Sequence, residues 1–451
     1  MLHRLLLPVL LVLSACMPTI SSYDQPTRAF TADTQMPAMR VFSNPRSQPA
    51  FRSNAEIARD ILDLSMRLES GRYLPYFTRF EGPITVAVRG NPSPTLTTDL
   101  GRLLYRLQTE AGLQITQTNE RDANILVNAV TRKDIQRVLP YAACFVAPNV
   151  SSLAEYRIAR RTNMASWSAM RERKRITIFV PTDVSPQETR DCLHEELAQA
   201  IGPLNDLYRL PDSIFNDDNI HTVLTGFDML VIKAMYAPEL HSGMTRPEVA
   251  NRLPEVLARL NPAGQRPPSK LLPYTPTQWR DNMITAMGPG AGMSARLSAA
   301  EAALRIATAN HLTDVRMGFN WYAIGLLTER SDPDRSIAAF QNAYQYYQAN
   351  QGTEIHRAQV ASKIATYALH NGNPQMALDY IAPSLAAAIR AENAALLSSL
   401  MLLRSEALMR NGMATDARAA RVDSLGWARY GFGSERELKQ RLRVITGFSP
   451  L

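Results

Sequence analysis

Hydrophobic positions in the first half of the chain recur with two different periods. Leu96, Leu100, Leu103 and Leu107 are spaced as on one face of an amphipathic helix. Short runs rich in Val and Ile are typical of buried strands. The pattern predicts helices at about 53–70, 95–111 and 187–201, strands at about 84–88, 113–118, 124–130, 143–146 and 175–180, and a long basic helical stretch before the last strand. This order indicates an α+β domain over about residues 53–245.

The second half of the chain has a different pattern. Residues 246–293 are rich in Pro, Asn and Gly, with a helix expected only around 247–260, and are predicted to be a bridge. Residues 294–451 have a helical period throughout. We therefore expect a separate all-α domain there.

Helix-breaking residues recur at a regular interval within this all-α region. Pro374 follows Pro333 by 41 positions, and Ala414 follows Pro374 by 40, each at the start of an amphipathic helix. Helix pairs at this period stack as solenoids that resemble tetratricopeptide arrays, which bind a peptide or protein partner. The alternative is a plain helical bundle that only packs on the first domain.

The first residues indicate export and lipid anchoring. A short positive end is followed by nine apolar residues at 5–13, too few to cross a bilayer and typical of a secretory signal peptide over residues 1–15. The run ends in Leu-Ser-Ala-Cys, which resembles a bacterial lipobox and implies acylation of Cys16. The alternative is an ordinary signal peptide with a chance cysteine. Residues 16–52, rich in Ser, Thr, Pro, Gln and Asn, then predict a flexible tether.

This anchor implies a location and a membrane partner. A multiply acylated Cys16 would hold the protein on the periplasm-facing side of a membrane in the bacterial cell envelope. Residue 17 is Met rather than the Asp that retains such lipoproteins at the inner membrane, so by analogy the outer membrane is favoured.

Charge and cysteine content narrow the functional classes further. The chain of 451 residues has a formal net charge of +8 but no long basic run, which argues against nucleic-acid binding. With Cys16 acylated, Cys144 and Cys192 are the two remaining cysteines, and an oxidising compartment predicts a disulfide between them.

One segment, residues 191–206, has a spacing associated with chemistry. A zinc peptidase of the H-E-x-x-H-x-x-G-x-x-H kind needs two ligands one helical turn apart, a glutamate to activate water, a glycine turn and a third ligand. A register that starts at His194 puts Ala198 at the second ligand position, and alanine cannot coordinate a metal.

A register that starts one residue later matches every spacing. Glu195, Gln199 and Asn205 then occupy the three histidine positions, Glu196 that of the general base, and Gly202 the turn. Because amides are poor zinc ligands, no bound metal and no other cofactor are expected. The apolar residues of this helix form a stripe, and Glu195 and Gln199 fall on the other side. We expect Glu195, Glu196 and Gln199 to line a cleft, in which case at least one carboxyl pKa should be raised by its neighbour. The alternative is that these three residues form only a solvated face of the helix.

The surrounding sequence resembles known families. Phe215 stands where metzincins have their methionine turn, and residues 224–236 are similar to the closing helix of matrixin-like peptidases. Residues 53–245 also resemble a proteobacterial lipoprotein family known only as a domain of unknown function, through Arg-Phe-Glu-Gly-Pro at 79–83 and the Glu-Glu-Leu-x-Gln helix. These resemblances imply a zincin-like fold and an envelope location, and no reaction.

Two functions follow as hypotheses. The first is a non-catalytic, zincin-like envelope lipoprotein whose helical repeats bind a partner. The second is an envelope hydrolase or peptidase with a non-standard site around Glu195 and Glu196, in which His194, His221 or His241 serves as ligand or base. The Asn-Asp-Asp-Asn run at 216–219 lacks the glycine and distal glutamate of a calcium loop and predicts a polar turn.

Overall fold

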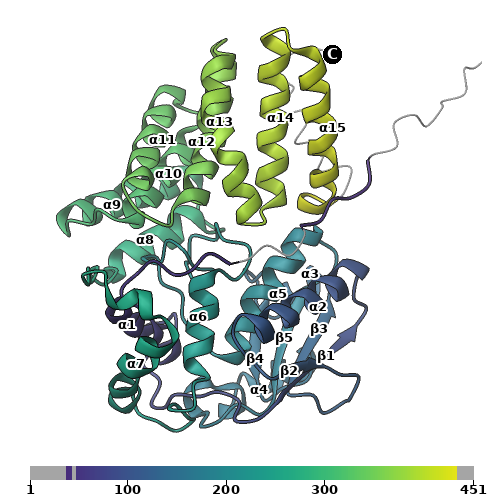
Figure 1. Ribbon diagram of the computed structural model, residues 1–451, viewed down its shortest axis with the longest axis vertical. Helices are drawn as coiled ribbons and strands as arrows, with labels where there is room; N and C mark the ends of the chain where they lie inside the picture. Colours follow the sequence, from purple (N-terminus) through teal and green to yellow (C-terminus); the bar gives the residue numbers. More distant parts are fainter. Residues whose placement is uncertain (1–36, 43–46, 434–451) are drawn as a thin grey trace, which may run out of the picture. The chain divides into compact units, whose positions relative to one another are not determined.

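The computed structural model describes residues 37–42 and 47–433 (Figure 1). The expected signal peptide and the lipidation site Cys16 lie outside these residues, as does the end of the expected helical domain beyond residue 433. Among the helices in the described ranges, none combines the length and apolar character needed to cross a membrane.

A five-stranded mixed sheet organises the first domain. Its order is β2-β1-β3-β5-β4, with β4 antiparallel to β5 at one edge and the other neighbours parallel. The strands are β1 (Ile84–Gly90), β2 (Ile115–Gln117), β3 (Ile125–Val130), β4 (Phe145–Pro148) and β5 (Ile176–Pro181). The helices of this part are α1 (Asn54–Ser65), α2 (Pro94–Thr109), α3 (Arg132–Gln136), α4 (Leu153–Ala159), α5 (Pro186–Ile201), α6 (Gly226–Met235) and α7 (Arg246–Leu260). The α+β prediction is confirmed.

Alternating side chains give the sheet two buried faces. Val86, Val127 and Ile178 point to the face covered by α2 and α5, where they join the largest hydrophobic cluster. Phe179 points the other way and stacks on Phe145 under α3 and α4. Because β5 is buried on both faces, its side chains are apolar except Thr177, whose buried hydroxyl donates to the carbonyl oxygen of Val150.

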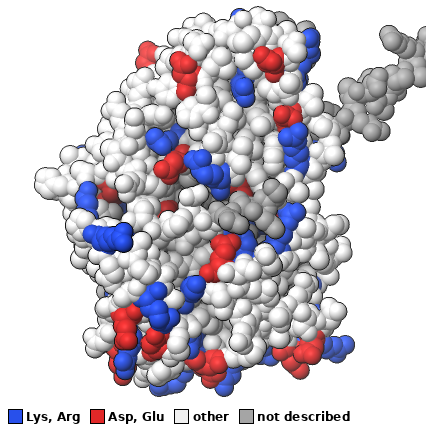
Figure 2. Space-filling view, viewed as in Figure 1, with Lys and Arg blue, Asp and Glu red and all other residues white. Residues whose placement is uncertain are grey.

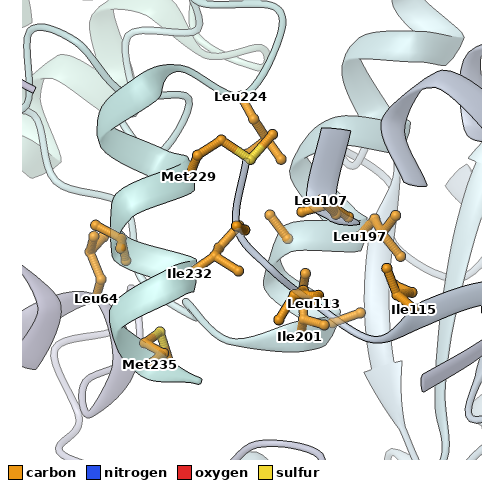
Figure 3. Packing of buried hydrophobic residues seen from close by; sticks show 14 of the residues in the cluster. Leu64, Leu107, Leu113, Ile115, Leu197, Ile201, Leu224, Met229, Ile232 and Met235 are labelled. Carbon is orange, nitrogen blue, oxygen red and sulfur yellow. The ribbon is translucent and has the colours of Figure 1, made fainter. Parts of the chain in front are cut away.

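Helix α5 lies in the centre of this core. Figure 3 shows Leu197 and Ile201 of α5 directed toward Leu107 and Ile115, with Ile232 of α6 on the opposite side. All five side chains are buried. Burying such side chains contributes about 1.5–3 kcal/mol each, so packing fixes the orientation of α5.

The second half of the described chain is helical, as expected. Its helices are α8 (Thr277–Met287), α9 (Met293–Ala309), α10 (Val315–Thr328), α11 (Pro333–Gln348), α12 (Glu354–His370), α13 (Pro374–Arg390), α14 (Ala394–Arg410) and α15 (Ala414–Gly431), and consecutive helices from α8 to α15 pack on one another (Figure 1). Pro333 and Pro374 are the first residues of α11 and α13. Gly372 and Gly412 have φ of +69° and +77° in the preceding turns, a conformation that favours glycine.

Buried polar contacts join the helical array to the α/β part. Tyr430 of α15 donates to Asp99 of α2 at 2.6 Å, and Gln187 of α5 donates to Asn393 at 3.2 Å. His356 of α12 lies 2.9 Å from Asp218, and both side chains are buried. These contacts are satisfied only when the two parts stay together, so we expect them to move as one unit.

Three expectations need correction. The tether prediction is wrong over residues 37–42 and 47–52, which pack on the folded chain: Phe42 stacks on Trp427 with centroids 4.4 Å apart, and Arg52 pairs with Asp60 at 2.6 Å. The expected bridge contains α8, whose Trp279 is fully buried. The long basic helix before β5 is instead α4 and two short 3-10 turns. In each case tertiary packing outweighs local composition.

Candidate functional site

The ends of α5 are set by local interactions that the sequence encodes. Ser185 caps the N-terminus by accepting from the N–H of Glu188, and Pro186 is the first helical residue. At the other end the buried Arg173 donates to the carbonyl oxygens of Gln199 and Gly202, both at 2.5 Å. A cation there satisfies the last carbonyls and the helix dipole, so the C-terminus of α5 is held rigidly.

Gly202 ends α5 because another helix passes close to it. A Cβ at this position would lie 2.9 Å from the sulfur of Met235 in α6. Tyr236, just after α6, donates its hydroxyl to the carbonyl oxygen of Ile201 at 2.9 Å. The glycine of the motif is thus explained by helix packing, without any ligand.

The polar face of α5 lies against the loop that follows the helix. Glu195 is half-buried, whereas Glu196 and Gln199 are 5% and 8% exposed. Asp206 and Asp217 of this loop come close to Glu195, and Glu69 lies beside Asp206. We call Glu69, Glu195, Glu196, Asp206 and Asp217 the carboxyl cluster.

Contacts between carboxyl groups favour bound protons in this cluster. The side chains of Glu69 and Asp206 lie close enough to interact, and a hydrogen bond between two carboxyl groups forms only when one of them is protonated. The Tyr208 hydroxyl donates to Asp217. A carboxyl pair that shares a proton contains an acid and a base side by side.

The pKa values of the cluster are displaced upward. Burial, followed by the charges of Glu69 and Asp217, raises the pKa of Glu195 to about 7. Burial and then Glu195 raise the pKa of Glu196 well above its usual range, and burial raises the pKa of Asp217 to about 6. The expected raised carboxyl pKa is therefore confirmed, with burial as the largest cause.

The three positions that match zinc ligands by spacing do not form a metal site. Asn205 is 4% exposed, and its amide donates to the backbone carbonyl of Asp63 at 3.0 Å, which gives it a structural role. Within residues 37–42 and 47–433, no three His, Cys, Asp or Glu side chains are grouped so that they could hold a metal ion. The residues present do not fit zinc, and we derive no step through a metal.

The candidate histidines are directed elsewhere. His194 is buried on another face of α5, where its Nδ1 accepts from the N–H of Leu224 at 3.1 Å. Burial, then Arg106 and Arg190, lowers its pKa well below 6.5, so it is neutral at pH 7. His221 is hydrogen-bonded to the carbonyl oxygen of Pro211, and the exposed His241 is hydrogen-bonded to that of Ser242. None of the three is hydrogen-bonded to Glu195 or Glu196.

The sequence motif identified part of this cluster. Glu195 and Glu196 were candidates from the motif, and Asp206 lies in the loop that follows their helix. Glu69 and Asp217 were missed: Glu69 is far away in the sequence, and the 216–219 run forms a turn in which Asn216 donates to Asp218 at 2.8 Å. No local signal marks Glu69, because its proximity comes from the packing of α1 against the rest of the domain.

The disulfide prediction is confirmed. Cys144, just before β4, is bonded to Cys192 of α5, with Cα atoms 5.9 Å apart. The bond ties the helix that carries the carboxyl cluster to the edge strand of the sheet.

Charged side chains of both signs are interspersed on one face of the described chain. On the face shown in Figure 2, Lys and Arg side chains alternate with Asp and Glu side chains. That face has no basic patch of the kind that tracks a phosphate backbone.

Comparison with known proteins places the site inside a recognised domain. A family model described as "Protein of unknown function (DUF2927)" matches residues 54–255. This range includes the sheet, α5, α6 and all five residues of the carboxyl cluster. No curated protein matches the chain.

Proposed function

We propose that this protein is a lipid-anchored envelope protein that acts by binding a partner and not by metal-dependent catalysis. The observation that carries this proposal is the side chain of Asn205. Its amide is committed to the Asp63 carbonyl, so the third ligand position of the zincin-like register is used to hold the loop to α1. The scaffold of the peptidase motif remains, while its ligand set is replaced by groups with structural contacts.

A metal and activity measurement tests this proposal. We expect the purified full chain to contain no stoichiometric zinc and to leave a broad peptide library uncleaved. Stoichiometric zinc, or cleavage that is lost in Glu196→Gln but kept in the exposed control Glu120→Gln, would overturn it.

The anchor belongs to the same proposal and rests on the lipobox-like Leu-Ser-Ala-Cys sequence. We expect wild-type protein to incorporate an acyl label and to sediment with the outer membrane, and Cys16→Ser to do neither. Wild-type protein that is released without label would contradict the anchor.

The helical array supports partner binding. Helices α12, α13 and α14 have 17 residues each, and the 40- and 41-residue spacing sets the array at a tetratricopeptide-like period. The contacts to the α/β part come from Asn393, His356 and Tyr430, which lie at the ends of helices. Residues 37–42 cover part of α15, and the proposed peptide or protein partner would bind sides of the helices that are not covered in this way.

A second candidate function is favoured by the contact between the carboxyl groups of Glu69 and Asp206. A protonated carboxyl can donate to a leaving group while an ionised neighbour activates water, as in acid–base hydrolases. A metal-independent hydrolase would show an activity with a bell-shaped pH profile, abolished in both Asp206→Asn and Glu195→Gln. Activity that survives both substitutions would exclude this site.

A further inference from the structure

The carboxyl cluster differs from the ion-paired acids of the protein interior in its lack of a cation, although Asp217 accepts from the Tyr208 hydroxyl. Asp60, Asp63 and Asp314 are each paired with arginine. Asp99, Asp218 and Asp228 accept hydrogen bonds from Tyr430, His356 and Ser213. In the described chain, by contrast, none of the five cluster carboxyl groups forms an ion pair with Lys, Arg or His.

The inner end of the cluster has unsatisfied acceptors. Oε2 of Glu196 and Oδ1 of Asp206 are buried and have no hydrogen-bond partner. Glu196 as a whole is 5% exposed. Leaving a buried polar group unsatisfied costs about 1–3 kcal/mol, and more for a charged group. Such atoms call for an explanation, and a bound group near the cluster is one that fits its lack of ion pairs.

The cluster is open at its other end. Glu69 is exposed, and Glu195, Asp206 and Asp217 are half-buried, so the carboxyl groups run from solvent to the buried Glu196. The charge of Arg280 acts on Asp217, but Arg280 is ion-paired with Asp281 at 3.0 Å and donates to the backbone oxygen of Glu69. In the described chain Arg280 forms no ion pair with a carboxyl group of the cluster.

We propose that the carboxyl cluster binds an organic cation, the guanidinium or ammonium group of an arginine or lysine side chain on a peptide partner. This inference deepens the proposed function by naming the chemistry of the partner. The groups do not converge as metal ligands, which argues against a compact metal ion. A guanidinium has five N–H donors in a planar fork and can bridge several separated carboxyl groups at the open end, from the exposed Glu69 to the half-buried Glu195, Asp206 and Asp217.

Binding to the full chain in detergent tests this assignment by calorimetry. The probes are acetyl-Gly-Arg-Gly-amide, the same peptide with neutral citrulline in place of arginine, free agmatine, and calcium chloride. We expect the arginine peptide to bind at least about tenfold more tightly than the citrulline peptide, a difference that corresponds to 1.4 kcal/mol. Its affinity should fall as salt is added.

Variants locate the binding. Glu196→Gln and Asp217→Asn should each weaken the arginine peptide at least about fivefold, whereas Glu120→Gln, an equal charge change at an exposed site away from the cluster, should not. Glu196→Gln also removes like-charge repulsion, so this variant should fold, and a thermal melt checks that it does. Asp217→Asn provides a second, independent test of peptide binding.

The outcomes distinguish a free organic cation from a peptide side chain as the ligand, and both from a metal ion. Agmatine binding as tightly as the peptide supports recognition of the free cation, and binding of the peptide alone supports a peptide partner. Equal affinity for arginine and citrulline peptides, or calcium binding without peptide binding, would overturn the assignment. These binding measurements do not depend on acylation of Cys16 or on zinc content. The cation-binding proposal and the proposed function can therefore fail separately.

Discussion

Two groups of carboxylates lie close to α1, and they differ in whether they are paired with arginine. On α1 itself, Asp60 and Asp63 share Arg209 at 2.5 and 2.8 Å, and Arg52 and Arg246 complete their pairing. Beyond the end of α1, the carboxyl cluster contains five acids with no paired cation in the described chain. Paired charges in the interior serve the fold, whereas unpaired ones destabilise it and indicate a functional site.

The comparison also separates two faces of α5. His194 and Arg190 lie on the side toward α2 and the helical array, where Arg190 donates to the backbone oxygen of Glu392 at 2.7 Å. Glu195 and Glu196 lie toward the loop after the helix, with no such partners. One helix therefore contributes both to a paired interface and to an unpaired cluster, and the difference is decided by what packs against each face.

Breaking the paired group should have the largest effect. Arg209→Met leaves Asp60 and Asp63 without their shared buried cation, and should lower the free energy of unfolding by about 3–5 kcal/mol. Chemical denaturation measures it, with Arg335→Met as the control, because the exposed pair of Arg335 with Glu301 should contribute less than about 1 kcal/mol. Equal losses of unfolding free energy in Arg209→Met and Arg335→Met would show that the buried ion pairs of Arg209 contribute no more to stability than the exposed pair of Arg335.

The disulfide is expected to hold the unpaired cluster in place. Cys144→Ser with Cys192→Ser opens a link across a sequence separation of 48 residues, and should lower the free energy of unfolding by up to about 4 kcal/mol in the chain-entropy model. Hydrogen exchange should rise more in α5 than in α1. Uniform exchange in both helices would contradict a special role for the link at α5.

The pH dependence of stability should show the opposite sign from that of paired acids. In the unfolded chain Glu195 loses its proton near pH 4.5, whereas in the folded chain its pKa is about 7. Between these values the folded state holds more protons, so the free energy of unfolding falls as pH rises from 4.5 to 7, by about 2 kcal/mol. The groups facing Glu195 are Glu69 and Asp217, with Arg280 acting on Asp217.

Denaturation curves at several pH values check this dependence. The triple variant Glu195→Gln, Glu196→Gln, Asp206→Asn should lose most of the fall. A triple variant that retains the full wild-type slope would assign the pH dependence to other groups.

The smallest expected effect is a gain in stability. Glu196→Gln removes a buried charge that has no partner, and should raise the free energy of unfolding at pH 8 by about 1 kcal/mol. The gain should vanish at pH 4, where the carboxyl is protonated. Asp228→Asn is the matched contrast: Asp228 caps α6 and accepts from Ser213 and Ile214, so its loss should destabilise. Destabilisation by Glu196→Gln at pH 8 would mean that its carboxylate is satisfied.

The sequence determined the features that depend on local pattern. The α+β order, the helical second half and the start of α5 at Ser185-Pro186 follow from hydrophobic period and capping residues. The Cys144–Cys192 bond followed from cysteine number and compartment. Such features depend only on neighbouring residues along the chain or on the number of cysteines. A single sequence contains both kinds of information.

The tertiary structure alone decided which charges are paired. Asp63 and Glu69 are six positions apart, yet one meets Arg209 and the other meets Asp206. Residues 37–42 belong to the 16–52 segment, whose overall composition predicts a tether, yet they are held on α15 by the Phe42–Trp427 stack. Electrostatic and packing energies depend on distances between groups far apart in sequence, so the same carboxylate is a structural ion or part of a site according to what the fold places beside it.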